Sequence, residues 1–80
     1  AMSVNFGVNQ NGYVTSRLTE YFAARAKAGT GMIIVGGGAV DFIGKELPNL
    51  PMLQNDEAIP YLKKMTKKVK SFGAKFGMQL

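Results

Sequence analysis

A run of three glycines, Gly36-Gly37-Gly38, directly follows the apolar stretch Met32–Val35. Glycine has no Cβ, so a ligand can approach the backbone closely at such a run. The run does not match two common phosphate-binding patterns, because no G-x-G-x-x-G opens a helix after it and no Gly-Lys-Ser/Thr follows it. A plain turn and a ligand-contacting turn therefore both remain open for this segment.

Two side-chain amides stand in otherwise apolar stretches. Asn5 lies between Val4 and Phe6, and Gln79 lies beside Leu80. A lone amide in a strand is more often an interior or edge residue than a ligand contact. However, both amides and the glycine run fall at or near the C-terminal ends of expected parallel strands, where (β/α)8 barrels form their active sites. This shared position makes all three features candidates for a binding site.

Composition excludes several other kinds of chemistry. The chain has no cysteine and no histidine, which excludes disulfides and leaves no credible zinc site. The acidic residues show no paired spacing that a helix would bring together, and Asp56 and Glu57 are better explained as helix-start residues. No apolar run approaches the roughly 20 residues needed to cross a bilayer, and no targeting signal is visible. We expect a soluble, cytoplasmic protein with no membrane partner.

The net charge of +5 comes mainly from one lysine-rich segment. Half of the ten basic residues lie within residues 63–70, namely Lys63, Lys64, Lys67, Lys68 and Lys70. We interpret this segment as the solvated face of a helix. A nucleic-acid contact is the alternative, and it predicts steeply salt-dependent binding. The segment lacks interleaved aromatic residues, so we expect no nucleic-acid partner.

The first half of the chain predicts a strand, a helix and a second strand. Residues 2–8 form a short apolar and β-branched run, and the pair Asn11-Gly12 after it is a strong turn signal. Residues 17–28 have helical periodicity and contain four alanines, which favour a helix. The unbroken apolar run 32–35 is typical of a strand that is buried on both faces of a covered parallel sheet.

The second half predicts a long connection, a helix and a third strand. The connection covers residues 39–55, and loops beyond about 12–15 residues are mostly functional or disordered. Asn55 and Asp56 predict the start of a helix that ends at Gly73 and carries an apolar stripe opposite the lysines. Residues 75–80 then predict a strand.

The expected order is β-α-β-α-β, in which each helix is a crossover between parallel strands, so the fold class is α/β. Repeats of this unit build either a (β/α)8 barrel, which needs about 250 residues, or an open doubly wound sheet. A chain of 80 residues would supply three strands with two open edges. We therefore interpret it as a fragment of a larger α/β protein and expect it to form homo-oligomers through these edges.

An ordered set of short motifs runs through almost the whole chain without large gaps. The motifs are Asn11-Gly12-Tyr13-Val14-Thr15, Arg17-Leu18, Tyr21, Arg25-Ala26-Lys27-Ala28-Gly29, Gly31-Met32-Ile33-Ile34-Val35, Ala39-Val40-Asp41, Leu53-Gln54-Asn55-Asp56-Glu57, Ile59-Pro60 and Gly73-Ala74-Lys75-Phe76-Gly77-Met78-Gln79-Leu80. This set resembles the old yellow enzyme family of NAD(P)H:flavin oxidoreductases. Within that family it looks most similar to the branch of 2-enoate and 2,4-dienoyl-CoA reductases.

The resemblance implies a (β/α)8 TIM barrel that binds FMN across its strand ends. Residues 1–80 would form the incomplete N-terminal part of this FMN-binding domain, with strands one to three and two crossover helices. FMN would take hydride from NADH or NADPH and deliver it to a small-molecule activated alkene, either an enoate or an enoyl thioester. The family's substrate-anchoring and proton-donating residues belong to later segments, so no catalytic residue is assigned within this chain.

Five cofactor contacts carry over from the resemblance. Ser3, Val4 and Asn5 match the stretch after strand one that touches the isoalloxazine ring. Gly37 matches the small residue after strand two that lies near the flavin. Gln79 matches the glutamine of strand three that hydrogen-bonds the pyrimidine edge, where an amide can both donate and accept.

Two functional interpretations follow. The first is a fragment of an FMN-dependent ene-reductase that is itself inactive, because the phosphate site and the downstream residues are missing. The second is a non-enzymatic, self-associating α/β module or a truncated gene product, suggested by the open edges and the apolar content of 46%.

Overall fold

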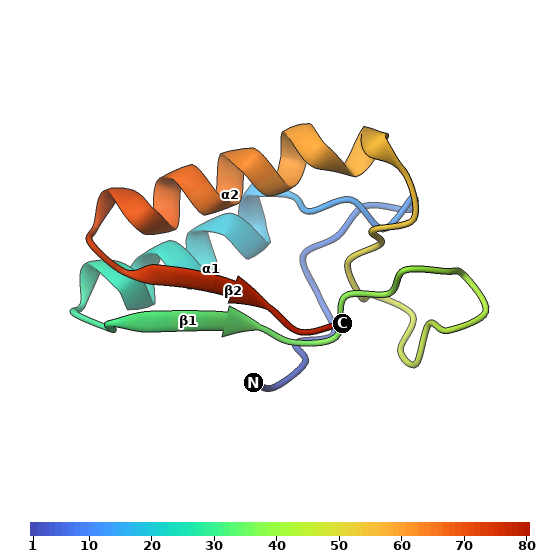
Figure 1. Ribbon diagram of the computed structural model, residues 1–80, viewed down its shortest axis with the longest axis horizontal. Coiled ribbons are helices and arrows are strands. Elements are labelled where there is room, and N and C mark those ends of the chain that lie inside the picture. The colour runs from blue at the N-terminus through green and yellow to red at the C-terminus, as the bar shows by residue number, and fades with distance from the viewer.

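The computed structural model describes residues 1–80 as two helices on one side of a two-stranded sheet (Figure 1). In chain order the elements are helix α1 (Ser16–Lys27), strand β1 (Met32–Val35), the 3-10 turn η1 (Asp56–Ala58), helix α2 (Ile59–Ser71) and strand β2 (Lys75–Met78). The helices α1 and α2 pack side by side and cover the same face of the sheet. None of the helices is long and apolar enough to span a membrane.

The start of the second helical segment follows the sequence prediction. The side chain of Asn55 accepts a hydrogen bond from the backbone N–H of Glu57 at 3.2 Å. One turn of 3-10 helix follows, and α2 begins at Ile59 with Pro60 in its first turn, where no N–H is required. Helix α2 ends at Ser71, two residues before the predicted stop at Gly73.

The two strands are parallel, as predicted, and their register pairs Met32 with Lys75 and Val35 with Met78. In β1, Ile33 and Val35 are buried beneath the helices, whereas 56% of Met32 and 43% of Ile34 is exposed. The prediction that this strand is buried on both faces is therefore wrong for this chain. The reason is that no second layer of the structure lies over the other face of the sheet.

The predicted first strand, residues 2–8, is also wrong as a strand. Only Met2 pairs with the sheet, through a single parallel bridge to Val35. The chain then turns, with the N–H of Phe6 donating to the carbonyl of Val4 at 2.9 Å. An apolar run forms a strand only where a neighbouring strand bonds its backbone, and this run instead packs its side chains against the core. The order β-α-β-α-β is thus only partly realised.

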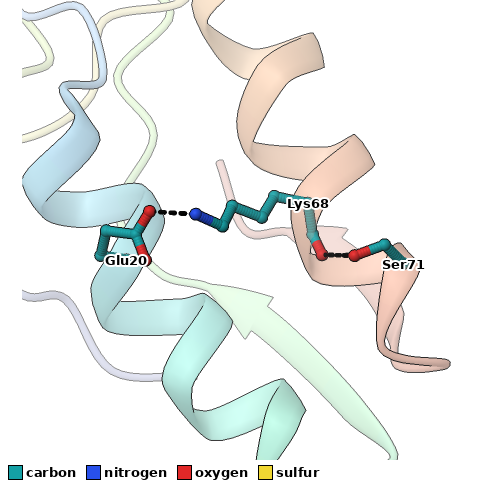
Figure 2. Close-up of polar contacts among 3 residues, drawn as sticks. All are labelled: Glu20, Lys68 and Ser71. Carbon is teal, nitrogen blue, oxygen red and sulfur yellow. Dashed lines mark hydrogen bonds and ion pairs between the residues drawn. The ribbon is translucent and has the colours of Figure 1, made fainter.

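The core joins both helices to both strands. Leu18 of α1, Val35 of β1, and Met65 and Val69 of α2 have no exposed surface. The other members of the cluster are Val14, Phe22, Ala26, Ile33 and Ala74. At the surface, Glu20 of α1 forms an ion pair with Lys68 of α2 (Figure 2). The two helices are therefore held together mainly by apolar packing, with one exposed charge pair beside it.

The long connection predicted for residues 39–55 is confirmed. It contains no helix or strand and has one bridge, between Ala39 and Met52. Towards its C-terminal end the connection is buried at Leu50 and Met52, whereas Ile43 in its first half is 94% exposed. The loop projects from the end of the molecule at which both strands finish (Figure 1).

Candidate cofactor-binding site

A cleft of about 260 Å³ lies where the two strands end. We call it the glycine cleft, and it is lined by Ser3, Gly37, Gly38, Ala39, Gly44, Glu46, Leu50, Gln79 and Leu80. Gly37 follows the end of β1, and Gln79 follows the end of β2. Ser3, Gly37 and Gln79 belong to the five cofactor contacts predicted from the sequence, so the structure brings three of the five together.

The glycine run lets three chain segments meet. A Cβ on Gly36 would lie 2.7 Å from the carbonyl carbon of Met2, which is closer than real Cβ contacts allow. Gly37 has φ of +73°, a conformation that only glycine adopts without strain, and its missing Cβ leaves room for the side chain of Ser3. The run therefore has a structural cause in the close approach of residues 2–3. Gly37 also lines the cleft, so a ligand contact remains compatible with it.

Backbone hydrogen bonds fix Gln79 at the cleft. Its N–H donates to the carbonyl of Val35 at 2.8 Å, and its own carbonyl accepts from the N–H of Gly38 at 2.9 Å. The amide of Gln79 and the hydroxyl of Ser3 make no hydrogen bond to any other protein group. Both side chains can therefore donate to and accept from a ligand.

Val4 and Asn5, the other two predicted contacts, have side-chain partners outside this cleft. Val4 packs against the apolar core. The side-chain oxygen of Asn5 accepts from the N–H of Asn49 at 2.9 Å, which attaches the long loop to the N-terminal segment. Neither residue lines the glycine cleft, and their contact with a flavin stays a prediction.

The chemistry of the glycine cleft fits one edge of a flavin. The pyrimidine edge of the isoalloxazine presents carbonyl oxygens and an N–H, which match an amide and a hydroxyl that each donate and accept. The cleft is smaller than the roughly 300–1,000 Å³ of pockets that hold whole ligands. Glu46 is its only charged residue, and no cation is present for a phosphate. The polar groups of the cleft thus match the ring edge, and no cationic side chain in its lining would bind the phosphate of FMN.

A second cleft, of about 240 Å³, was not predicted from the sequence. We call it the amide cleft, and it is lined by Gln10, Asn11, Tyr13, Phe42, Lys45, Met52, Gln54 and Asn55. The hydroxyl of Tyr13 donates to Oε2 of Glu57 at 2.9 Å, and its ring stacks on Tyr61 with centroids 5.1 Å apart. The hydrogen bond to Glu57 raises the pKa of Tyr13 above its usual value, so the phenol keeps its proton to a higher pH than a free tyrosine does. The one feature of the sequence that could have indicated this cleft was the length of the connection 39–55, which supplies part of its lining.

The largest hollow is a shallow groove of about 800 Å³ along α2. It is lined by Ile59, Leu62, Lys63, Thr66, Lys67, Lys70 and Ser71, and contains none of the predicted contacts. Ile59 and Leu62 belong to the predicted apolar stripe of this helix, but 54% of Ile59 is exposed. The groove is lined by residues of one helix and not by the ends of the strands, so we do not assign the cofactor to it. No cluster of acidic side chains could hold a metal ion.

A model of the NADH:flavin oxidoreductase / NADH oxidase family matches residues 1–80 of the chain. The chain belongs to this family. It is 38% identical over 77 residues to a metal reductase of Desulforamulus reducens, and this alignment covers 96% of this chain and 11% of the relative. It is 36% identical to an NADPH dehydrogenase of Listeria welshimeri and 39% identical to a 12-oxophytodienoate reductase-like protein of Solanum lycopersicum. Each of these two alignments covers 72 residues and 90% of this chain.

The match to this family model confirms the broad part of the resemblance, which is to flavin-dependent oxidoreductases. It does not distinguish the branch of 2-enoate and 2,4-dienoyl-CoA reductases, which stays a prediction. The chain spans 11% of the length of the metal reductase, 21% of the NADPH dehydrogenase and 20% of the 12-oxophytodienoate reductase-like protein. The activity and the substrates of the whole oxidoreductase are therefore proposals.

Proposed function

We propose that the chain is part of an FMN-dependent NAD(P)H oxidoreductase that reduces activated alkenes, and that the glycine cleft holds the pyrimidine edge of the flavin. One observation carries the cofactor proposal. Ser3 and Gln79, whose hydroxyl and amide have no protein partners, line one cleft with Gly37 where the two parallel strands end. This is the end at which (β/α)8 barrels build their sites.

Each of these residues has a distinct task in the proposal. Gln79 donates to and accepts from the ring edge, and the backbone bonds to Val35 and Gly38 keep its main chain in place. The missing Cβ of Gly37 leaves room for the side chain of Ser3, which brings the Ser3 hydroxyl to the cleft. Asn5 fastens the long loop that forms the far wall of the cleft. When bound, FMN supplies the hydride chemistry, and the protein supplies position and polarity.

The sheet supports the proposal that residues 1–80 are the N-terminal part of a larger (β/α)8 barrel. Met32 and Ile34 place apolar side chains on the uncovered face of the sheet. In a barrel this face points inward, where bulky apolar residues form a packed interior. We assign no proton donor within the chain, because the family's proton-donating residues belong to later segments, so we expect the 80 residues alone to give no steady alkene reduction.

The substrate proposal comes from the resemblance to enoate and enoyl-thioester reductases, and the whole oxidoreductase can test it. Under anaerobic conditions, NADH or NADPH should bleach the flavin absorbance. Adding an α,β-unsaturated carboxylate or an enoyl thioester should restore it, with formation of the saturated product. A flavin that is reduced but reoxidised only by oxygen would contradict the alkene proposal, and a protein purified without flavin that takes up none would contradict the cofactor proposal.

Self-association is the second candidate function, and the free edge of β2 favours it. Strand β2 pairs with β1 on one side only, so its other edge presents unpaired backbone groups. Light scattering after size-exclusion chromatography should then show a mass that rises with protein concentration. A constant monomer mass would contradict self-association and would leave the cofactor proposal untouched.

A further inference from the structure

A single turn of the long loop separates the glycine cleft from the amide cleft. Gly44 and Glu46 line the glycine cleft, and Lys45 between them lines the amide cleft. The turn is closed by hydrogen bonds from Gly44 N to the carbonyl of Asp41 at 3.1 Å and from Lys45 N to that of Phe42 at 3.2 Å. Consecutive residues of this turn therefore line the two clefts, which are neighbours in the structure.

The amide cleft holds several polar side chains without protein partners. The amides of Gln10, Asn11 and Gln54 make no hydrogen bond. Lys45 is the only charged side chain in the lining, and it is in no ion pair, because the single ion pair of the structure joins Glu20 and Lys68. The cleft thus offers amide donors and acceptors together with one free positive charge.

Two aromatic rings complete the chemistry of the amide cleft. Phe42 is 73% exposed at its rim, which leaves a ring face open to a planar ligand. Tyr13 also lines the cleft and is held in place by its hydrogen bond to Glu57 and its stacking on Tyr61. Asn and Gln amides pair with the edge of adenine, aromatic rings stack on bases, and a lysine ammonium binds phosphate.

We propose that the amide cleft binds a phosphorylated adenosine, with Lys45 on the phosphate, Phe42 on the base and the free amides on the base edge. This rests on the proposed function, because the ligand is then one whose reacting end lies at the flavin in the glycine cleft. At about 240 Å³ the amide cleft is too small for a whole dinucleotide and suits one part of it. Two ligands of the proposed reaction carry this group: NADPH has a 2′-phosphate and a coenzyme A thioester has a 3′-phosphate.

The test titrates the isotope-labelled chain with adenosine 2′,5′-bisphosphate, adenosine 3′,5′-bisphosphate and unphosphorylated adenosine, and follows backbone amide signals by NMR. We expect saturable shifts at Asn11, Lys45 and Gln54 with a bisphosphate, and at least tenfold weaker binding of adenosine. Preference for the 2′,5′ isomer assigns the cleft to NADPH, and preference for the 3′,5′ isomer assigns it to the thioester.

The variant Lys45→Gln should weaken bisphosphate binding about tenfold, because it removes the one cation of the cleft. Lys67→Gln is the matched control, since Lys67 lies in the groove of α2 and its loss removes the same charge from the chain. Equal weakening by both variants would mean non-specific attraction to a basic protein and would overturn the proposal. So would shifts confined to the lysines of α2, or no saturable shift with any probe.

A second measurement uses the whole oxidoreductase, where folding of the isolated chain is not required. There Lys45→Gln should raise KM for the favoured ligand, NADPH or the enoyl thioester, about tenfold and leave kcat and KM for NADH unchanged. Unchanged KM for both phosphorylated ligands would overturn the proposal. FMN content, measured on the same samples, separates the two ideas: flavin binding without bisphosphate binding removes this inference alone, and bisphosphate binding without flavin removes the proposed function alone.

Discussion

The backbone N–H of Met52 donates to the carbonyl of Gly12 at 2.9 Å, and the side chain of Met52 fills the space that a Cβ on residue 12 would need. This contact joins the turn that contains Gly12 to the C-terminal part of the long connection, residues 39–55. Residues of both segments line the amide cleft. The shape of that cleft therefore depends on glycine at position 12.

Gly12→Ala should lower the free energy of unfolding by at least about 2 kcal/mol, because alanine would be strained at φ of +80° and would also collide with Met52. Urea denaturation followed by circular dichroism measures this change. Gly31→Ala is the control, since no heavy atom lies within 4 Å of a Cβ there. An equal loss of stability in both variants would contradict the contact.

Tyr13 should make stability depend on pH in the alkaline range. Its hydrogen bond to Glu57 raises its pKa above the usual value of 10.0, so the folded state holds the proton more tightly than the unfolded state does. The resulting stabilisation is fully present below about pH 10 and is lost as the pH rises through the folded pKa. Melting temperatures measured from neutral to alkaline pH should therefore fall more steeply for the wild type than for Tyr13→Phe.

The control for this pH effect is Tyr21→Phe. The hydroxyl of Tyr21 makes no hydrogen bond in the structure, so this variant should follow the wild-type pH profile. If Tyr13→Phe and the wild type instead lose stability in parallel, the phenol of Tyr13 is not held by Glu57.

The ion pair between Glu20 and Lys68 should contribute little to stability. The two side chains are 60% and 42% exposed, and exposed pairs of this kind contribute about 0.2–1 kcal/mol (Figure 2). A double-mutant cycle with Glu20→Gln and Lys68→Gln gives the coupling energy, which should shrink further in high salt. A coupling above about 2 kcal/mol would mean that the pair, rather than the core residues Leu18 and Met65, holds the helices together.

The helical parts of the fold could be predicted from the sequence because their signals are local. The Asn55 cap acts within two residues, and the predicted helix 17–28 differs from α1 by one residue at each end. Residues 2–8 have the composition of a strand, but only Met2 bridges the sheet, and Val8 forms an isolated antiparallel bridge to Val14. Periodicity within a segment carries no information about whether a partner lies beside it, which is why this prediction failed.

The candidate site was likewise predictable where the signal was local and not where it depended on tertiary contacts. Position at strand ends predicted a site at the glycine run, Gln79 and Asn5, and the family resemblance added Ser3. The structure gathers Ser3, Gly37 and Gln79 in one cleft and leaves Asn5 outside it. The amide cleft was missed because Gln10 and Lys45 come from two loops that tertiary contacts bring together, among them the hydrogen bond from Met52 to Gly12. No spacing within either loop indicates that contact.

The most direct test of the central claim is an NMR titration of the isotope-labelled chain with FMN. We expect saturable shifts at Ser3, Gly37 and Gln79. The affinity should be weak, in roughly the millimolar range, because no cation lines the glycine cleft to bind the phosphate. Gln79→Leu should weaken binding about tenfold, whereas Gln54→Leu, which removes an exposed amide outside this cleft, should leave it unchanged. Shifts that avoid Ser3, Gly37 and Gln79, or equal effects of the two variants, would contradict the assignment of the flavin to the glycine cleft.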